Sequence, residues 1–153
     1  MPRGSAFPVE QREFPARFTS LTDSAEFVDT FCARHGVDTD LALKLTLVLE
    51  ELFTNTITHG FGAESDATVR IALTASHAQS VSLIFEDTGP AFDPLAADTP
   101  RPHTLDGAFG ARPVGGLGIH LVKQFASAQR YAREDGRNRL WLTLDSAADS
   151  SQA

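Results

Sequence analysis

The segment EELFTNTITHG holds two polar side chains whose types and spacing could do chemistry. Glu51 and Asn55 are four residues apart, so on a helix they stand one turn above another at the edge of its apolar stripe. An amide oxygen suits a hard cation such as Mg²⁺, and a carboxylate one turn away can act as a general base or orient a hydroxyl nucleophile. Polar residues beside an apolar stripe are also routine on solvated helix flanks. The pair alone leaves both interpretations open.

A second segment, DTGPAFDP at residues 87–94, follows an apolar run that is typical of a strand. Asp87 ends that run and could accept a hydrogen bond from an exocyclic amine, while Gly89 allows a tight turn or the close approach of a ligand. Asp, Gly and Pro after a strand also make an ordinary turn. This motif alone does not separate the two interpretations.

A third segment, PVGGLGIHLVKQF, places Gly115, Gly116 and Gly118 directly before an amphipathic run. Flexible backbone donors at a helix N-terminus form a natural site for an anion, and we favour phosphate binding over a loop that needs glycine only for its geometry. The chain has neither a GxxxxGK[ST] loop nor a glycine pattern after its first strand. These absences disfavour the P-loop and Rossmann nucleotide folds.

The elements that must position these segments follow from hydrophobic periodicity. We expect an edge strand within residues 10–18, a helix from a Thr22 or Asp23 cap to Gly36, and a long helix from an Asp38 cap to near Gly60. The later expected elements are strands over 67–75 and 80–87, a lid over about 91–114, a helix opened by residues 115–118, and strands over 129–134 and 138–144. This order predicts an α+β sandwich of two layers, a mostly antiparallel mixed sheet covered on one face by helices.

Composition narrows the class of protein. The 153 residues, 42% of them apolar, are enough for one domain, which we expect over residues 10–145 between disordered ends at 1–9 and 146–153. A net charge of −7 with scattered basic residues disfavours nucleic acid as a direct partner. The sequence lacks both the roughly 18 consecutive apolar residues of a membrane span and a signal-like start. We therefore expect a cytoplasmic protein without membrane contact, with the single Cys32 as a small buried hydrophobe.

Taken together, the three segments resemble the N, G1 and G2 boxes of the GHKL (histidine-kinase-like) ATPases, whose Bergerat fold is an α+β sandwich of this kind. The forms DTGPAFDP and GGLGIHLV are similar to those of the anti-sigma-factor serine kinases of bacterial partner-switching systems. The resemblance covers roughly residues 10–145 and implies ATP and Mg²⁺ as ligands.

The resemblance also implies roles for particular residues. Asn55 would bind Mg²⁺, Glu51 would be the catalytic base, Asp87 would meet the adenine amino group, and Gly89 would line the adenine pocket. The phosphates would be cradled by Gly115, Gly116, Leu117 and Gly118.

Some positions depart from the family pattern. Ala91 stands where the second glycine of the G1 box is expected, and Asn138 or Arg139 falls near the position of a threonine often found before the last strand. In the lid, Arg101 and Arg112 could neutralise the γ-phosphate or could be solvated charges. His59 is interpreted as a helix-end residue.

The leading hypothesis is a switch enzyme that phosphorylates a serine on an anti-sigma-factor antagonist and sequesters a sigma factor or similar partner, with ATP as phosphoryl donor. The alternative is a protein-interaction module that binds ATP without transferring phosphate. A histidine-kinase ATPase domain is a third class, which the first 20 residues do not favour because they offer no dimerisation helix with a phosphoacceptor histidine. The family implies a homodimer, and the expected edge strand allows one.

Overall fold

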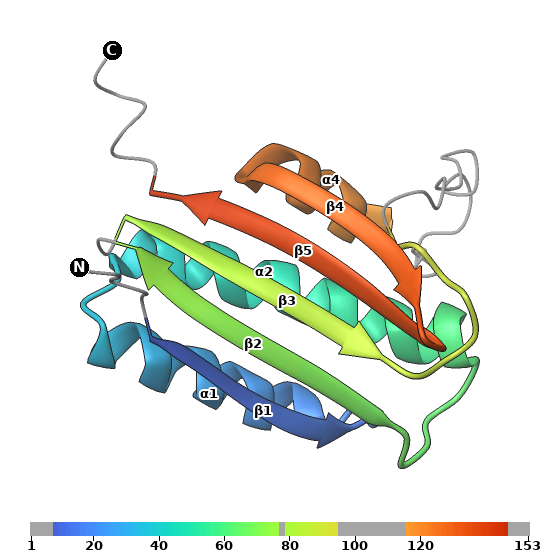
Figure 1. Ribbon diagram of the computed structural model, residues 1–153. Coiled ribbons are helices and arrows are strands. Elements are labelled where there is room, and N and C mark those ends of the chain that lie inside the picture. The colour runs from blue at the N-terminus through green and yellow to red at the C-terminus, as the bar shows by residue number, and fades with distance from the viewer. Residues whose placement is uncertain (1–7, 77–78, 95–115, 147–153) are drawn as a thin grey trace, which may run out of the picture.

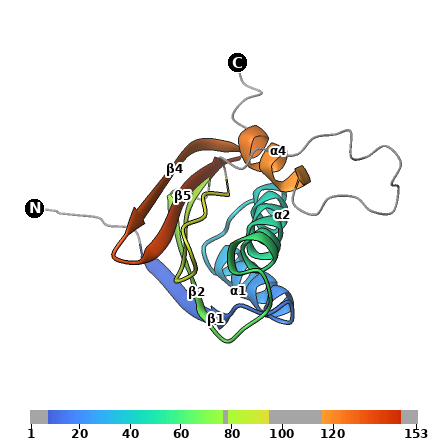
Figure 2. The same cartoon turned by 90° about the vertical axis from the view of Figure 1, so that its right-hand side faces the viewer.

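A five-stranded sheet carries the fold in the computed structural model, which describes residues 8–76, 79–94 and 116–146, with residues 116–120 described by their backbone alone. The elements in chain order are β1 (Val9–Pro15), α1 (Ser20–Arg34), α2 (Thr39–Asn55), η1 (Thr56–Phe61), β2 (Thr68–Ser76), β3 (Ser80–Asp87), α4 (Gly116–Phe125), β4 (Ala126–Glu134) and β5 (Arg137–Asp145). The strands lie in the order β1-β2-β3-β5-β4, and each pairing between the described strands is antiparallel. Helices α1, α2 and α4 cover one face (Figures 1 and 2). The predicted two-layer α+β sandwich is confirmed.

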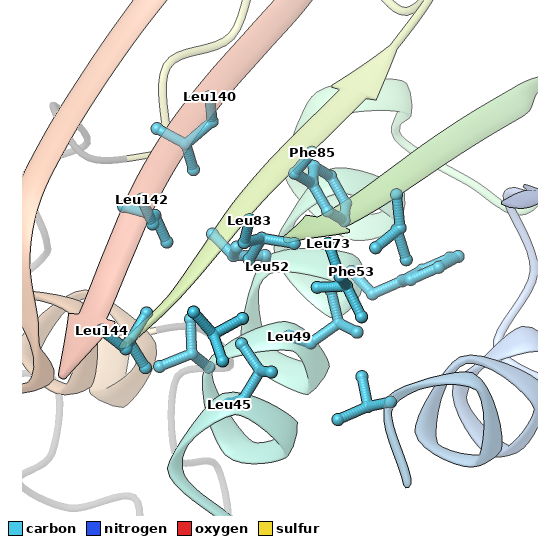
Figure 3. Close-up of a cluster of buried hydrophobic side chains, with 14 of the residues drawn as sticks. Leu45, Leu49, Leu52, Phe53, Leu73, Leu83, Phe85, Leu140, Leu142 and Leu144 are labelled. Atoms are coloured by element: carbon cyan, nitrogen blue, oxygen red, sulfur yellow. The ribbon is translucent and has the colours of Figure 1, made fainter. Parts of the chain in front are cut away.

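The core lies between α2 and the covered face of the sheet (Figure 3). Residues three and four apart on α2 fall on one face, while alternate residues of each strand point toward it. The largest of these buried side chains include Phe53, Leu45, Leu49, Leu52, Leu73, Leu83, Leu140 and Leu142. Phe53 packs edge to face between Phe14 and Phe85, with ring centroids 6.3 and 5.9 Å away. Burial of each such side chain contributes roughly 1.5–3 kcal/mol, which anchors α2 firmly on the sheet.

Helix α1 begins earlier than the sequence predicts, but it ends at the predicted place. The helix starts at Ser20, because the preceding residues already form a turn and the Ser20 hydroxyl donates to the carbonyl of Pro15 at 2.8 Å. The expected cap at Thr22 or Asp23 is therefore wrong. At the other end, Gly36 has a φ of +65°, and the Val37 N–H donates to the Cys32 carbonyl at 2.9 Å. This Schellman arrangement explains why the helix stops at a glycine.

The long helix ends near Gly60, as the sequence predicts, but its last part is not α-helical. It is α-helical to Asn55 and continues as the wider π-helical segment η1, which ends at Phe61 and is capped by Gly62, with a φ of +90°. The Gly62 N–H donates to the Ile57 carbonyl, five residues earlier, at 2.9 Å. Such π segments are frequent at functional sites. Here the segment turns Gly60 and Phe61 toward the loop after β3, as the contacts at Gly89 and Phe92 below demonstrate.

The three motifs of the sequence meet at one end of the sandwich. The carboxyl ends of α2 and β3 and the amino ends of α4 and β5 all lie on the right in Figure 1. In the described part of the chain, no helix is long and apolar enough to cross a membrane.

Candidate nucleotide-binding site

Asn55 is the last residue of α2, and its side chain is buried, with only 5% of the residue exposed. Its Oδ1 has no hydrogen-bond partner among the described residues. Leaving a buried acceptor unpaired costs about 1–3 kcal/mol, so such an oxygen in a native fold calls for an explanation. An amide oxygen is a suitable ligand for Mg²⁺. The geometry therefore fits a site in which Asn55 receives a cation.

Glu51 lies one turn before Asn55 on the same helix and is partly buried. The helix places both side chains along the same line, as their spacing predicts. Glu50, the residue directly before Glu51, is exposed instead. A carboxylate beside a cation ligand can act as a general base for a hydroxyl group bound at the same place.

Asp87 ends β3 and is buried, with 4% of the residue exposed. Its Oδ1 accepts hydrogen bonds from the Gly89 N–H at 2.8 Å and from Asn138 Nδ2 at 3.0 Å. Burial raises the pKa of Asp87 above its ordinary value, while the bonds from Asn138 and Gly89 and the positive charge of Arg133 oppose part of that rise. The result is a desolvated hydrogen-bond acceptor at the carboxyl end of β3.

Gly89 follows in a tight turn that brings the loop against η1. A Cβ atom at this position would lie 3.0 Å from the ring of Phe61 and 3.2 Å from Oδ1 of Asp87. On the other side of the same contact, a Cβ atom on Gly60 would lie 3.2 Å from the ring of Phe92. Glycine at both positions therefore allows the two segments to pack closely, and a larger residue would push the facing ring by a few tenths of an ångström. Gly89 thus lies in direct contact with the carboxylate of Asp87.

The glycine motif is described only in part. Gly116, Leu117 and Gly118 form the first residues of α4, as the sequence predicts for a helix opened by this motif. Helix α4 packs against α2, where Lys44 Nζ lies 5.2 Å from the ring centroid of Phe125. The backbone N–H groups at its start suit an anion. Gly115, Arg101, Arg112 and most of the expected lid lie outside the described residues.

The structure also decides which of Asn138 and Arg139 lies beside Asp87. Asn138 pairs directly with Asp87 across β3 and β5 and is buried, with 4% exposed. Arg139 lies on the opposite face of the sheet, where Nη2 contacts Glu86 at 2.9 Å. Asn138 is therefore the residue that faces the site.

Sequence reasoning missed two further residues that contact this end of the sheet. Tyr131 and Arg133, on β4, contact the Oδ1 atom of Asn138, at 2.6 and 3.2 Å, and Arg133 also donates to the carbonyl of Gly89 at 2.7 Å. The apolar pattern of β4 is weak. Only the pairing register between β4 and β5 could have indicated that Tyr131 and Arg133 lie beside Asn138.

Comparison with known proteins identifies the family of this chain. Residues 14–144 match the family of the histidine kinase-like ATPase domain. Over 139 residues, the chain is 33% identical to the serine/threonine-protein kinase BtrW of Bordetella bronchiseptica, covering 90% of this chain and 94% of that protein.

Two solved structures share the fold. One holds the RsbU and RsbW domains of Rv1364c from Mycobacterium tuberculosis, with a TM-score of 0.62 and 14% identity over 90% of this chain, which spans only 32% of that longer chain. The other is the SiaB–SiaC complex from Pseudomonas aeruginosa, with a TM-score of 0.54 and 14% identity over 88% of both chains. With a family match that spans most of its residues, this chain belongs to the histidine kinase-like ATPase domain family.

Proposed function

We propose that this chain is a cytoplasmic, ATP-dependent protein serine kinase that regulates transcription by partner switching. The observation that carries the proposal is the buried, unpaired Oδ1 of Asn55, one helical turn from Glu51. A purely structural helix end would gain nothing from an unsatisfied amide there.

In this proposal, Asn55 Oδ1 holds Mg²⁺, and Asp87 accepts from the amino group of adenine. The metal ion would neutralise charge on the phosphates. The backbone at Gly115, Gly116, Leu117 and Gly118 would bind the phosphates at the start of α4. Glu51 would accept the proton of a serine hydroxyl as its oxygen attacks the γ-phosphorus and ADP leaves.

The relatives support the proposed partners. BtrW, similar along nearly the whole chain, is named as a serine/threonine-protein kinase, and the structure of SiaB was solved in complex with SiaC. We infer that this chain phosphorylates a serine-bearing anti-sigma-factor antagonist and, in another state, sequesters a sigma factor or a similar regulator.

The kinase is tested with γ-labelled ATP, Mg²⁺ and purified anti-sigma-factor-antagonist domains from the same genome. Wild-type protein should label one serine of one antagonist, and replacement of that serine by alanine should abolish the label. Glu51→Gln should bind ATP with little change yet transfer phosphate at least about 100-fold more slowly, in the range expected for loss of a general base.

Glu50→Gln is the matched control, because this exposed neighbour changes the same charge on the same helix without facing the site. It should transfer phosphate at the wild-type rate. If Glu51→Gln also kept full transfer, the base would be another residue. ATP binding without labelling of any antagonist would favour the alternative, an ATP-binding interaction module.

We also propose that the chain forms a homodimer. Strand β1 lies at the edge of the sheet and pairs with β2 alone among the described strands, and Val9 at its start is 60% exposed. An open edge strand is a template for pairing with a second chain. Gel filtration with light scattering should report twice the mass of 16.5 kDa, and the mass of one chain would contradict the dimer.

A further inference from the structure

The face of the sheet opposite the helices carries an aromatic side chain beside positive charges. The described helices all cover the other face (Figure 2). Trp141, on β5, is the only tryptophan of the chain and is partly exposed on the open face. The guanidinium carbon of Arg130, opposite it on β4, lies 4.1 Å from the centroid of the indole ring, and that of Arg139 lies 5.7 Å from it. Both distances are within the range of cation–π attraction, so the two arginines hold the indole in place.

A hollow of about 220 Å³ lies next to this indole on the same face. Its apolar part is continuous, because Ala72, Ile84 and Trp141 lie side by side in the register of β2, β3 and β5. The hollow is bounded by polar side chains, those of Gln11, Arg70, Glu86 and Arg139. An apolar centre with a polar rim is typical of a protein–protein interface.

The charges around the hollow favour an acidic partner. Between Trp141 and the β4–β5 turn, the ionisable side chains of this face are four arginines and three glutamates, namely Arg70, Arg130, Arg137, Arg139, Glu13, Glu86 and Glu134. The side chain of Glu86 is 7% exposed and contacts three of the arginines, so it presents little negative charge to solvent. Arg130 is exposed and makes no ion pair with a described carboxylate. In a chain with a net charge of −7, this is a local excess of positive charge.

We propose that the Trp141 surface, formed by Ala72, Ile84, Arg130, Arg139 and Trp141, docks an acidic peptide segment of a partner protein that also carries an aliphatic side chain. The aliphatic side chain fills the hollow beside the indole, and a carboxylate pairs with the guanidinium of Arg130. A guanidinium that stacks on a ring keeps the N–H groups at its edge free to donate, so Arg130 can bind the carboxylate without leaving the indole. Arginine and tryptophan are also the residue types that contribute most to protein interfaces.

This surface lies on the other side of the sheet from the proposed nucleotide site. Asp87 and Asn138 lie on the covered face, because successive residues of a strand point to opposite faces. Their neighbours Glu86 and Arg139 lie on the open face with Trp141. A peptide on the Trp141 surface would therefore leave the nucleotide site accessible, and the inference does not depend on ATP binding.

The test uses the fluorescence of Trp141, which reports on this surface alone because the chain has no other tryptophan. The full chain, without nucleotide, is titrated with the peptide GEELEELEEG, with the leucine-free GEEGEEGEEG and with the basic GKKLKKLKKG. The first peptide should shift the emission saturably, with a dissociation constant below about 1 mM, and should bind more weakly as the salt concentration rises. The other two should bind at least about fivefold more weakly, because each lacks one of the two required features.

Arg130→Gln should weaken binding of GEELEELEEG by about 3- to 10-fold, since it removes one charge-assisted contact at a partly exposed site. Arg12→Gln is the matched control. Arg12 also lies over an aromatic ring, 4.8 Å from the centroid of Phe14, but its strand position faces the covered side of the sheet. The control removes the same charge and should leave the affinity unchanged. An equal loss in both variants would show a response to overall charge and would overturn the proposal.

Four further results would overturn the proposal. They are an unchanged emission with GEELEELEEG, equal binding of either comparison peptide, tighter binding of a single-stranded oligothymidylate, and an emission that changes when the protein alone is diluted. The third would assign the stacked tryptophan and arginine to nucleic acid, and the fourth, with light scattering, would assign the surface to a second copy of the chain. None of these measurements involves ATP, so their failure leaves the proposed function standing. The wild-type titrations need no variant, so poor folding of a variant cannot leave the inference undecided.

Discussion

The ring of Phe61, in the π-helical segment after α2, lies against Gly89, in the turn after β3, so closely that a Cβ atom on Gly89 would be 3.0 Å from Cε1 of the ring. The same atom would lie 3.2 Å from Oδ1 of Asp87. This contact joins the helix that carries Glu51 and Asn55 to the strand that carries Asp87. The proposed Mg²⁺ and adenine positions are therefore coupled through one glycine.

Replacing Gly89 with alanine should disturb both positions. The added methyl group must displace the Phe61 ring or the Asp87 carboxylate, so we expect ATP affinity to fall about 10-fold or more and stability to fall by roughly 1–3 kcal/mol. Titration calorimetry and thermal melting measure the two effects.

Gly36→Ala is the control for Gly89→Ala. Gly36 has a φ of +65° and open space around its Cα, so alanine there strains the backbone far from the site. It should lower stability by about 1 kcal/mol and leave ATP affinity unchanged. Equal ATP affinity for Gly89→Ala and wild type would contradict the coupling.

Asn55 should contribute little to the stability of the nucleotide-free protein. Its Oδ1 is buried without a partner, so Asn55→Ala removes an unsatisfied acceptor while leaving a small cavity. We expect the free energy of unfolding to change by less than about 1 kcal/mol, measured by urea denaturation without nucleotide. Leu52→Ala, at a fully buried core position of the same helix, should instead cost about 2–5 kcal/mol. A similarly large loss in Asn55→Ala would mean that Asn55 is structural.

Glu86 should make the stability of the protein depend on acid. It lies on the open face of the sheet with its side chain 7% exposed, in contact with Arg139, Arg70 and Arg137. Burial alone would raise the pKa of Glu86, but the hydrogen bonds and charges of the three arginines outweigh it and hold that pKa below the ordinary 4.5. Because the folded pKa is depressed, the stabilisation is present above about pH 4.5 and is lost as the pH falls through the folded value.

Glu86→Gln tests this dependence. At pH 7 the variant should be less stable than wild type by about 1–2 kcal/mol. This loss of stability is modest because the arginines are partly exposed and water screens their charges. The difference from wild type should shrink as the pH falls below 4.5. Thermal melts at several pH values measure it, and a difference that stays constant down to pH 3 would show that the charge of Glu86 is not involved.

Much of the fold could be predicted because its elements are strongly periodic. The apolar spacing from Leu41 to Ile57 predicts α2, and the runs around Ile71 and Leu83 predict the hairpin β2–β3. Helix caps are harder to predict: α1 begins directly after Thr19, whose side chain makes no capping hydrogen bond, so the residue type alone does not mark the start. The end of this helix near Gly60 was predicted, but the change from α- to π-helical geometry after Asn55 was not, because the apolar spacing up to Ile57 is that of a regular α-helix.

The site could be predicted only as far as its motifs reach. Asp87 and Gly89 form a recognisable turn. Whether Asn138 or Arg139 faces them depends on the register between β3 and β5, because a shift of one residue would move each side chain of the strand to the other face of the sheet. Tyr131 and Arg133 belong to a strand with little alternation, so their place beside Asn138 needed the three-dimensional pairing.

The central claim is that Asn55 completes a site for ATP and Mg²⁺. The most direct measurement is calorimetric titration of ATP with Mg²⁺ into wild-type protein and into Asn55→Ala, both folded as judged by their thermal melts. We expect saturable binding by wild type and at least about a 10-fold loss of affinity in the variant, the scale of one charge-assisted contact. Equal affinity in the two proteins, or no binding by wild type, would contradict the account.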